Sequence, residues 1–105
     1  MKKHTKIYCD FFGYGEQDFI PSELSGQQAN DLHHIEARGS GGSKLKDTIK
    51  NLMALTRKEH DKYGDKEQHL DWLQEKHDQF IIQFLFFNPD KFSQMDQESQ
   101  DYYNI

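Results

Sequence analysis

The feature that most constrains the fold is the stretch Asp31–His60, which holds histidines and an asparagine in a fixed order between glycines and apolar runs. Two adjacent histidines, His33 and His34, lie in the short segment Leu32–Ile35, whose apolar ends predict a β-strand. Neighbouring residues of a strand point to opposite faces, so only one of the two imidazoles can readily face a given ligand. The two histidines are therefore expected to have different roles.

A second strand and a helix are expected to follow the histidine pair. The glycine- and serine-rich segment 38–46 predicts a loop, and Asn51–Leu55 predicts the second strand. Thr56 and Glu59 form a capping-box pattern, in which each side chain accepts a hydrogen bond from the other residue's backbone amide. A helix is therefore expected to begin at about Arg57.

Two helices are expected after the second strand. The first contains His60 in its first turn or just beyond, and Gly64 is a typical C-terminal stop. The second, over residues 65–87, is predicted by apolar residues at three- and four-residue steps. This stripe contains Leu70, Leu73, His77, Phe80, Ile81 and Phe84. The cluster Phe80–Phe87 is expected to be core or a homodimer surface rather than a base-stacking platform.

The N-terminal segment predicts a β-hairpin. Residues 5–12 are β-branched and aromatic, residues 18–21 begin a second extended piece, and Ser22–Gly26 predicts a tight knuckle that turns the chain back. Three apolar side chains are expected to hold this hairpin by packing: Phe19, Ile20 and Leu24. The last segment, 89–105, is polar and acidic with late aromatics, and it predicts either a loose tail or a short docking helix.

Length and composition predict one α+β domain with a small core. The chain has 105 residues, of which 34% are apolar and 30% are charged. The domain is expected to cover residues 1–88, with the strands and first helix at about 30–64 and the packing helix at about 65–87. Residues 89–105 are expected to form the acidic C-terminal tail.

The sequence predicts a cytoplasmic protein. No apolar run reaches the roughly 18 residues of a transmembrane helix, so no membrane span is expected. The N-terminus lacks the apolar stretch and small-residue cleavage site of a signal peptide. The single cysteine, Cys9, excludes an internal disulfide and a four-cysteine zinc site, and it fits a reducing cytosol.

The net charge of −5 is unevenly distributed along the chain. Residues 1–60 contain nine Lys/Arg and eight Asp/Glu, a net +1, whereas residues 61–105 contain four and ten, a net −6. Residues 38–58 contain six basic residues and one acidic residue. Positive charge around the histidines is compatible with a phosphate-bearing substrate. The negative net charge of the whole chain argues against tight non-specific DNA binding.

The histidines provide the groups that phosphodiester hydrolysis needs: an activated water, charge neutralisation at the phosphate and stabilisation of the leaving oxygen. His33 and His60 are the expected ligands of one divalent metal ion. His34, next to a ligand but free of the metal, is the expected general base. Arg38 and Lys44 are candidates for phosphate contacts, and Arg38 is favoured because its planar guanidinium matches phosphate oxygens.

The identity of the metal stays open among Mg, Mn, Zn and Ni. Imidazole ligands suit zinc, nickel and manganese better than magnesium, but an open site with two histidines also admits magnesium. Asp31, two residues before His33 and on the same strand face, is a candidate to orient that imidazole.

The order histidine, histidine, asparagine, histidine, set in strand, loop, strand and short helix, resembles the HNH endonucleases of the ββα-metal (His-Me finger) group. The resemblance covers roughly residues 20–64 and implies a ββα-metal core. It implies that His33 and His60 are metal ligands and that His34 is the general base. Asn51 matches the family asparagine, which ties the loop to the second strand and holds the base in place. The stand-alone architecture is similar to free-standing HNH proteins of bacteria and their phages.

The chain departs from the family pattern at two places. Many members carry two cysteines in the knuckle as part of a structural zinc site, and Ser22 and Ser25 stand there in this chain. Serine is not a usual zinc ligand, so no structural zinc is expected. Colicin-type domains carry a third metal histidine one turn after the last one, where this chain has Gly64. With two histidine ligands, the metal is expected to enter with the substrate.

The resemblance implies a divalent-metal-dependent endonuclease that hydrolyses phosphodiester bonds in DNA, with catalytic residues His34, Asn51 and Arg38. The alternative is a non-catalytic module that retains the fold and binds nucleic acid or another protein. A further alternative is a structural zinc domain built on His33, His60 and one more histidine, which a chelator would unfold. The sequence leaves open whether the enzyme nicks one strand or cleaves both strands. It also leaves open whether the substrate is DNA or RNA.

Overall fold

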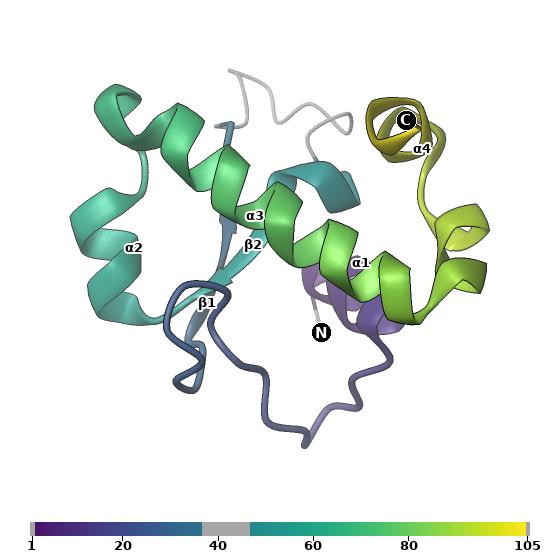
Figure 1. Ribbon diagram of the computed structural model, residues 1–105. Helices are drawn as coiled ribbons and strands as arrows, with labels where there is room; N and C mark the ends of the chain where they lie inside the picture. The colour runs from purple at the N-terminus through teal and green to yellow at the C-terminus, as the bar shows by residue number, and fades with distance from the viewer. Residues whose placement is uncertain (1, 37–46, 105) are drawn as a thin grey trace.

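The computed structural model describes residues 2–36 and 47–104, and these residues form an α+β fold around a small antiparallel sheet. The sheet pairs strand β1 (Asp31–His34) with strand β2 (Leu52–Leu55), close to the two predicted strands. Helix α3 (Glu67–Phe87) runs across the sheet, as Figure 1 shows, and corresponds to the predicted packing helix.

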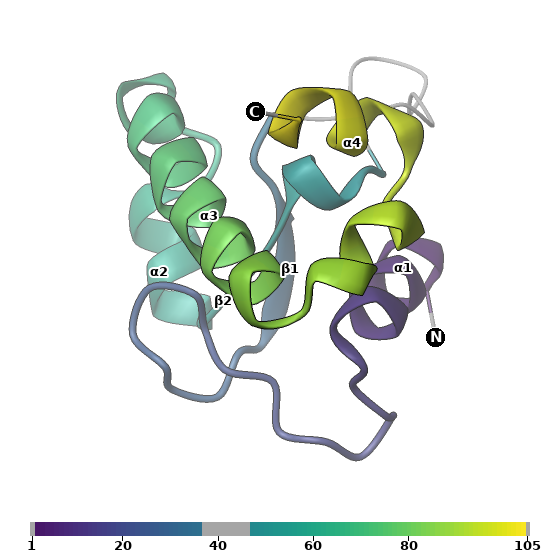
Figure 2. The same cartoon turned by 45° about the vertical axis from the view of Figure 1, so that its right-hand side comes forward.

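Shorter helices surround the sheet and α3 (Figures 1 and 2). In the described ranges these are α1 (Lys3–Phe12), η2 (Ile49–Asn51), α2 (Arg57–Tyr63), η3 (Pro89–Gln94) and α4 (Gln97–Tyr103). Helix α2 follows β2 directly and lies beside the first turns of α3, whereas α1 and α4 lie on the opposite side of the molecule. None of the helices that the structure describes has the length and apolar character needed to span a membrane.

Strand β2 is buried on both faces and separates two hydrophobic clusters. Leu52 and Ala54 belong to one cluster, and Met53 and Leu55 belong to the other, as the alternation of a strand requires. The other buried members of the first cluster are Tyr8, Phe11, Phe12, Ile49, Ile81, Met95 and Tyr103; those of the second are Ile35 and Leu73. Packing on both faces makes the sheet a rigid frame for the histidines of β1.

The N-terminal β-hairpin expected from residues 5–12 is wrong, because this segment forms helix α1. Its buried side chains recur at one-, three- and four-residue steps, which places them on one side of a helix. These side chains are Tyr8, Phe11 and Phe12, together with Cys9. Aromatic residues favour strands only where a pleated surface receives them. In the described residues the sheet has two strands, and the rings of this segment pack into the first hydrophobic cluster from a helix. Gly13, at a φ of 80°, ends the helix in the left-handed conformation.

The predicted knuckle Ser22–Gly26 is confirmed as a tight turn, in which the amide of Gly26 donates to the carbonyl of Ser22 at 2.9 Å. Of the three apolar side chains expected to hold it, Phe19 is exposed and the other two are partly buried. The hydroxyl of Ser22 donates to the carboxylate of Glu59 on α2. A polar contact to α2 therefore holds the knuckle together with apolar packing.

The segment 89–105 contains a docked helix, which agrees with one of the two interpretations that the sequence left open. The carboxylate of Asp96 accepts from the backbone amide of Ile49, and the hydroxyl of Ser99 accepts from the amide of Lys50. Its buried side chains are Met95, Ser99 and Tyr103. This docking holds η2, which leads directly into β2.

Candidate active site

The structure brings His33 and His60 together from β1 and α2. Their ring centroids lie 4.8 Å apart and the ring planes are inclined by 51°. His33 is 3% exposed, and its Nε2 is a buried nitrogen without a hydrogen-bond partner in the described part of the chain. A buried polar atom without a partner is destabilising unless a ligand binds it. The arrangement is the one expected of two ligands of a common cation.

The N-terminal cap of α2 fixes the position of His60. The hydroxyl of Thr56 accepts from the amide of Glu59 at 3.1 Å, and the carboxylate of Glu59 accepts from the amide of Thr56 at 2.8 Å. The predicted capping box is therefore confirmed. Because His60 directly follows Glu59, the cap sets the direction in which its imidazole leaves the helix.

Gly64, which ends α2, lies against both imidazoles. A Cβ at this position would lie 2.5 Å from Cδ2 of His60 and 3.2 Å from Cε1 of His33. The first of these distances is far shorter than a carbon–carbon contact. A side chain at position 64 would therefore require the ring or the carbonyl group of His60 to shift.

Asp65 is a third candidate ligand, which the sequence analysis missed. One donor atom each from His33, His60 and Asp65 lie within 4.8 Å of one another. Asp65 adopts a φ of 57°, a left-handed conformation that Asp and Asn adopt more readily than most residues with a side chain. No regular spacing in the sequence relates Asp65 to the two histidines. The site thus offers two imidazoles and a carboxylate.

Asp31 orients His60 rather than His33, so the expected pairing is wrong. Its carboxylate lies 3.1 Å from Nδ1 of His60, and it also accepts two hydrogen bonds from the guanidinium of Arg57, at 2.7 and 2.8 Å. The bond from Arg57 is the main reason that the pKa of Asp31 lies below its usual range. An ionised Asp31 holds the Nδ1 proton of His60, which leaves Nε2 as the free ligand atom.

Burial favours the neutral imidazole of His33, which is the protonation state that binds a metal ion. The pKa of His33 is lowered, first because burial disfavours the charged imidazolium and second because His60 lies beside it. The neutral imidazole retains a lone pair, whereas the imidazolium does not. His33 is therefore a neutral donor near pH 7.

His34 lies on the opposite face of β1, near Asp47 and the first turn of α1. Its Nε2 lies 2.8 Å from Oδ1 of Asp47, and its ring centroid lies 5.0 Å from that of His4. The side chain of His34 is 16% exposed and that of Asp47 is 2% exposed. Neither Asp47 nor His4 was singled out from the sequence as a partner of this histidine, because nothing in their spacing relates them to it.

Asn51 connects the two strands at the end nearest His34. Its side-chain oxygen accepts from the amide of Glu36 at 2.8 Å, and its side-chain nitrogen donates to the carbonyl of Glu36 at 3.0 Å. The two bonds fasten the chain just after β1 to the residue just before β2.

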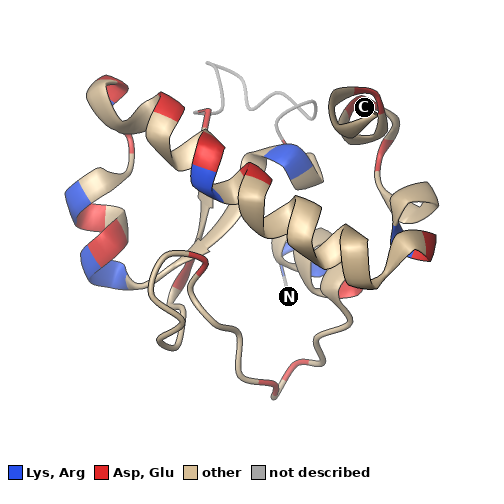
Figure 3. Cartoon of the chain, in the orientation of Figure 1, with Lys and Arg blue, Asp and Glu red and all other residues tan. Residues whose placement is uncertain are grey.

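The expected phosphate contacts, Arg38 and Lys44, lie outside the described residues. Among the described basic residues, Arg57, Lys58 and Lys62 lie on α2, and Figure 3 colours both basic and acidic residues along this helix. Arg57 is held by Asp31 while its side chain stays 66% exposed. Charge around the histidines is thus present on α2, but it is balanced by neighbouring acids.

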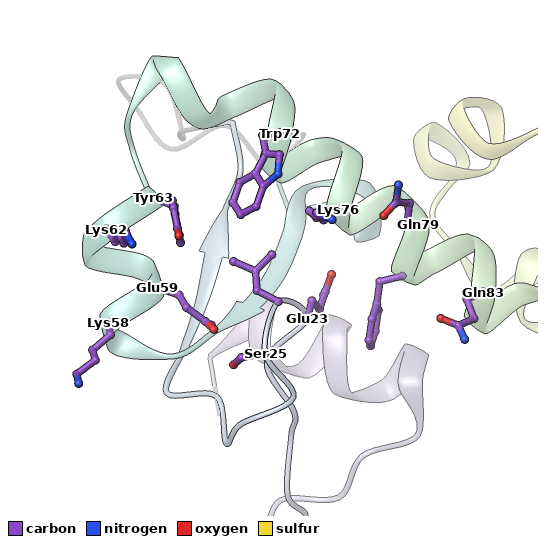
Figure 4. A pocket seen from close by; sticks show the side chains of 12 residues that line it. Glu23, Ser25, Lys58, Glu59, Lys62, Tyr63, Trp72, Lys76, Gln79 and Gln83 are labelled. Carbon is purple, nitrogen blue, oxygen red and sulfur yellow. The ribbon is translucent and has the colours of Figure 1, made fainter.

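A separate hollow of about 690 Å³ lies between α2, α3 and the knuckle (Figure 4). Lys58, Lys62 and Lys76 line it together with the rings of Tyr63 and Trp72. Lys58 and Lys62 are each two residues from His60, and two helical residues subtend about 200°, so they project from the opposite side of α2. The hollow is therefore distinct from the histidine cluster, which holds the groups able to do chemistry.

Comparison with known proteins gives no match for this chain among family models, curated sequences or solved structures.

Proposed function

We propose that this protein is a divalent-metal-dependent endonuclease of the HNH type, which hydrolyses phosphodiester bonds in DNA. Its ββα-metal core would consist of β1, β2 and α2, which follow one another in the order that this group uses. The observation that carries the proposal is the convergence of donor atoms from His33, His60 and Asp65 on one side of β1, with His34 next in the strand.

The residues of this convergence fit a divalent cation. His33 offers a buried nitrogen without a partner, and His60 offers Nε2 because Asp31 engages its Nδ1. Asp65 adds a carboxylate oxygen from the exposed side of the cluster. When bound, the ion would supply positive charge against the phosphate and the leaving oxygen.

His34 would act as the general base. An ionised carboxylate only accepts hydrogen bonds, so the contact with Asp47 assigns the ring proton of neutral His34 to Nε2. Nδ1 is then the nitrogen that takes a proton from water. The water oxygen attacks the phosphorus, the bond to the 3′-oxygen breaks, and the product carries a 5′-phosphate. Asn51 would keep His34 in place through its two bonds to Glu36.

The substrate we propose is DNA, contacted by the basic residues of the segment 38–58, with Arg38 and Lys44 as the phosphate contacts. The six basic residues of this segment support the choice of a polyanion. The compartment we propose is the cytoplasm, because Cys9 is a buried free thiol that needs no oxidising environment. We also propose homodimer formation over the end of α3, where Phe86 and Phe87 are 79% and 71% exposed.

A plasmid-cleavage assay tests the function. Untagged protein is incubated with supercoiled DNA and Mn²⁺ or Mg²⁺, with and without EDTA. His34→Ala should lose about 10²-fold or more in cleavage rate at unchanged metal affinity, and His60→Ala should lose both cleavage and metal affinity. His69→Ala is the matched control, since His69 lies on α3 outside the cluster.

Each outcome of this assay decides between named alternatives. Full activity in His34→Ala would remove the base assignment. A wild-type protein that binds DNA but cleaves none with either metal would contradict the nuclease and favour the non-catalytic module. Unfolding by EDTA alone, followed by circular dichroism, would instead identify a structural metal domain.

A further inference from the structure

A second group of metal-type donors lies on the other face of β1 from His33. His4, His34 and Asp47 each place a donor atom within 4.8 Å of the other two. Nε2 of His34 and Oδ1 of Asp47 are already 2.8 Å apart, and the carboxyl group of Asp47 is almost fully buried. The three residues come from α1, from β1 and from the segment before η2, so only the folded chain brings them together.

We propose that His4, His34 and Asp47 form a second metal site, selective for a transition-metal ion such as Zn²⁺, and that an ion bound there inhibits the enzyme. The inhibitory part rests on the proposed function, because it requires His34 to be the general base. The binding part does not, since it follows from the donor set alone.

The donor distances suit an ion of this size after small side-chain rotations. Zinc–nitrogen and zinc–oxygen bonds are about 2.0–2.2 Å long, so neighbouring donors of a tetrahedral site lie about 3.3–3.5 Å apart. The 2.8 Å contact between His34 and Asp47 would open slightly, and His4 would move inward. His4 lies in the first turn of α1 and is partly buried.

The donor set determines which ions compete for the site. Two imidazoles with one carboxylate suit zinc, nickel and copper, whereas magnesium prefers an octahedral set of oxygens and keeps several waters. The site should therefore discriminate strongly between Zn²⁺ and Mg²⁺. The first site offers the same types of donor. The two sites therefore differ in use because an activating ion at the first site must also contact the phosphate.

An ion at this site would inhibit through the ring proton of His34. A neutral imidazole carries one proton, which the contact with Asp47 assigns to Nε2. An ion can bind Nε2 only in the tautomer whose ring proton lies on Nδ1, so binding moves the one ring proton from Nε2 to Nδ1 through solvent. Nδ1 then donates instead of accepting, and it cannot take a proton from water.

Calorimetric titration of the untagged, full-length protein with Zn²⁺ tests the binding. His4→Ala should bind one Zn²⁺ fewer than the wild type, and the control His69→Ala should bind as many as the wild type. Mg²⁺ should give no heat that depends on His4. Identical zinc binding by wild type and His4→Ala would overturn the proposal. His4→Gln, checked by circular dichroism, replaces His4→Ala if the alanine variant does not fold.

The same variants test inhibition in the Mn²⁺-supported cleavage assay. Without zinc, His4→Ala should cleave at the wild-type rate, because His4 has no part in the proposed reaction. With rising zinc, His4→Ala should need about tenfold more for half-inhibition, the smallest loss expected when a ligand is removed. Equal inhibition of both proteins would end the regulatory role. If His4→Ala binds one Zn²⁺ fewer but the wild-type protein cleaves no DNA, the second metal site is supported and the proposed nuclease function is contradicted.

Discussion

Gly64 decides, at the scale of single residues, how closely the two candidate ligand histidines approach each other. Its hydrogen atoms occupy the space in which a Cβ would lie 2.5 Å from the ring of His60 and 2.6 Å from the carbonyl oxygen of the same residue. The backbone oxygen cannot move without unwinding the last turn of α2, because it accepts the hydrogen bond of the Gly64 amide. The glycine is thus required by the site as well as by the helix end.

Gly64→Ala is therefore expected to separate His33 and His60 and to lower metal affinity about tenfold or more, by displacing ligands that stay chemically intact. Overpacking should also reduce the free energy of unfolding by about 1–3 kcal/mol. Calorimetry with Mn²⁺ and urea unfolding in EDTA measure the two effects separately. Gly15→Ala is the matched control, since a Cβ there would make only an ordinary contact with Asp18 at 3.4 Å. Unchanged metal affinity in Gly64→Ala would contradict this role of the glycine.

The candidate ligands Asp65 and Asp47 show what sequence patterns could not reveal at this scale. Asp65 approaches the histidines only because its φ is positive, a backbone conformation that no periodicity encodes. Asp47 lies next to His34 although 13 residues separate the two in the sequence, so their contact depends on tertiary packing. The resemblance to the HNH endonucleases predicts that His33 and His60 lie together, whereas the positions of the two carboxylates follow only from the tertiary structure.

At the scale of helices and strands, elements with local sequence signals such as a helix cap or a short apolar run were predictable. Elements whose conformation depends on tertiary packing were not. Helix α2 begins where the Thr56 cap predicts, and β1 and β2 lie within one or two residues of the predicted strands. For the residues of helix α1 the sequence predicts a strand, because their β-branched and aromatic side chains have high strand propensity. The packing of those rings against β2 and α3 overrides that propensity.

Glu59 connects two elements, since its carboxylate accepts from the amide of Thr56 and from the hydroxyl of Ser22 in the knuckle. Burial alone would raise the pKa of Glu59, but the hydrogen bonds from Ser22, Ser25 and Thr56 hold it below the usual range. An ionised carboxylate with several donors thus occupies the junction of α2 and the knuckle.

Glu59→Ala is expected to lower the free energy of unfolding by about 1–3 kcal/mol, because it removes a helix cap and leaves the Ser22 hydroxyl without its acceptor. Glu59→Gln should lower the free energy of unfolding less than Glu59→Ala does, since glutamine also completes a capping box. Lys58→Ala, one residue earlier on the exposed side of α2, should be nearly neutral. Urea unfolding of the three variants provides the measurement. A Glu59→Ala protein as stable as Lys58→Ala would show that packing alone holds the knuckle.

At the scale of the whole molecule, one buried ion pair joins four of the described helices and strands to the knuckle. Nδ1 of His77 on α3 lies 2.6 Å from Glu23 of the knuckle, and Nε2 lies 2.7 Å from the carbonyl oxygen of Ile49 in η2. Glu23 also accepts from the hydroxyl of Tyr8 on α1 and from the amide of Ala54 on β2. Both nitrogens of His77 face acceptors, so both carry protons and the ring is an imidazolium. Removing its charge would leave Glu23 buried without a counter-ion.

The pH dependence of stability should report this pair. Burial on its own would lower the pKa of His77, but Glu23 and the Ile49 carbonyl outweigh it and the pKa is raised. A raised folded-state pKa contributes stability that is fully present below the unfolded value of about 6.5 and is lost as pH rises through the folded value. His33, whose pKa is lowered, acts in the opposite sense, and its contribution is lost as pH falls below about 6.5.

The free energy of unfolding in EDTA is therefore expected to be greatest near pH 6.5 and to decline on both sides, with the alkaline decline due to His77. Urea unfolding from pH 5 to 9 measures the curve, and carbon-13 shifts of the imidazoles assign each limb to its residue. Glu23→Gln should remove the alkaline decline, because a neutral partner no longer favours the imidazolium, while His69→Gln should leave it intact. Stability that stays level from pH 6.5 to 9 in the wild type would mean that His77 is neutral and that hydrogen bonding without charge holds the centre of the fold.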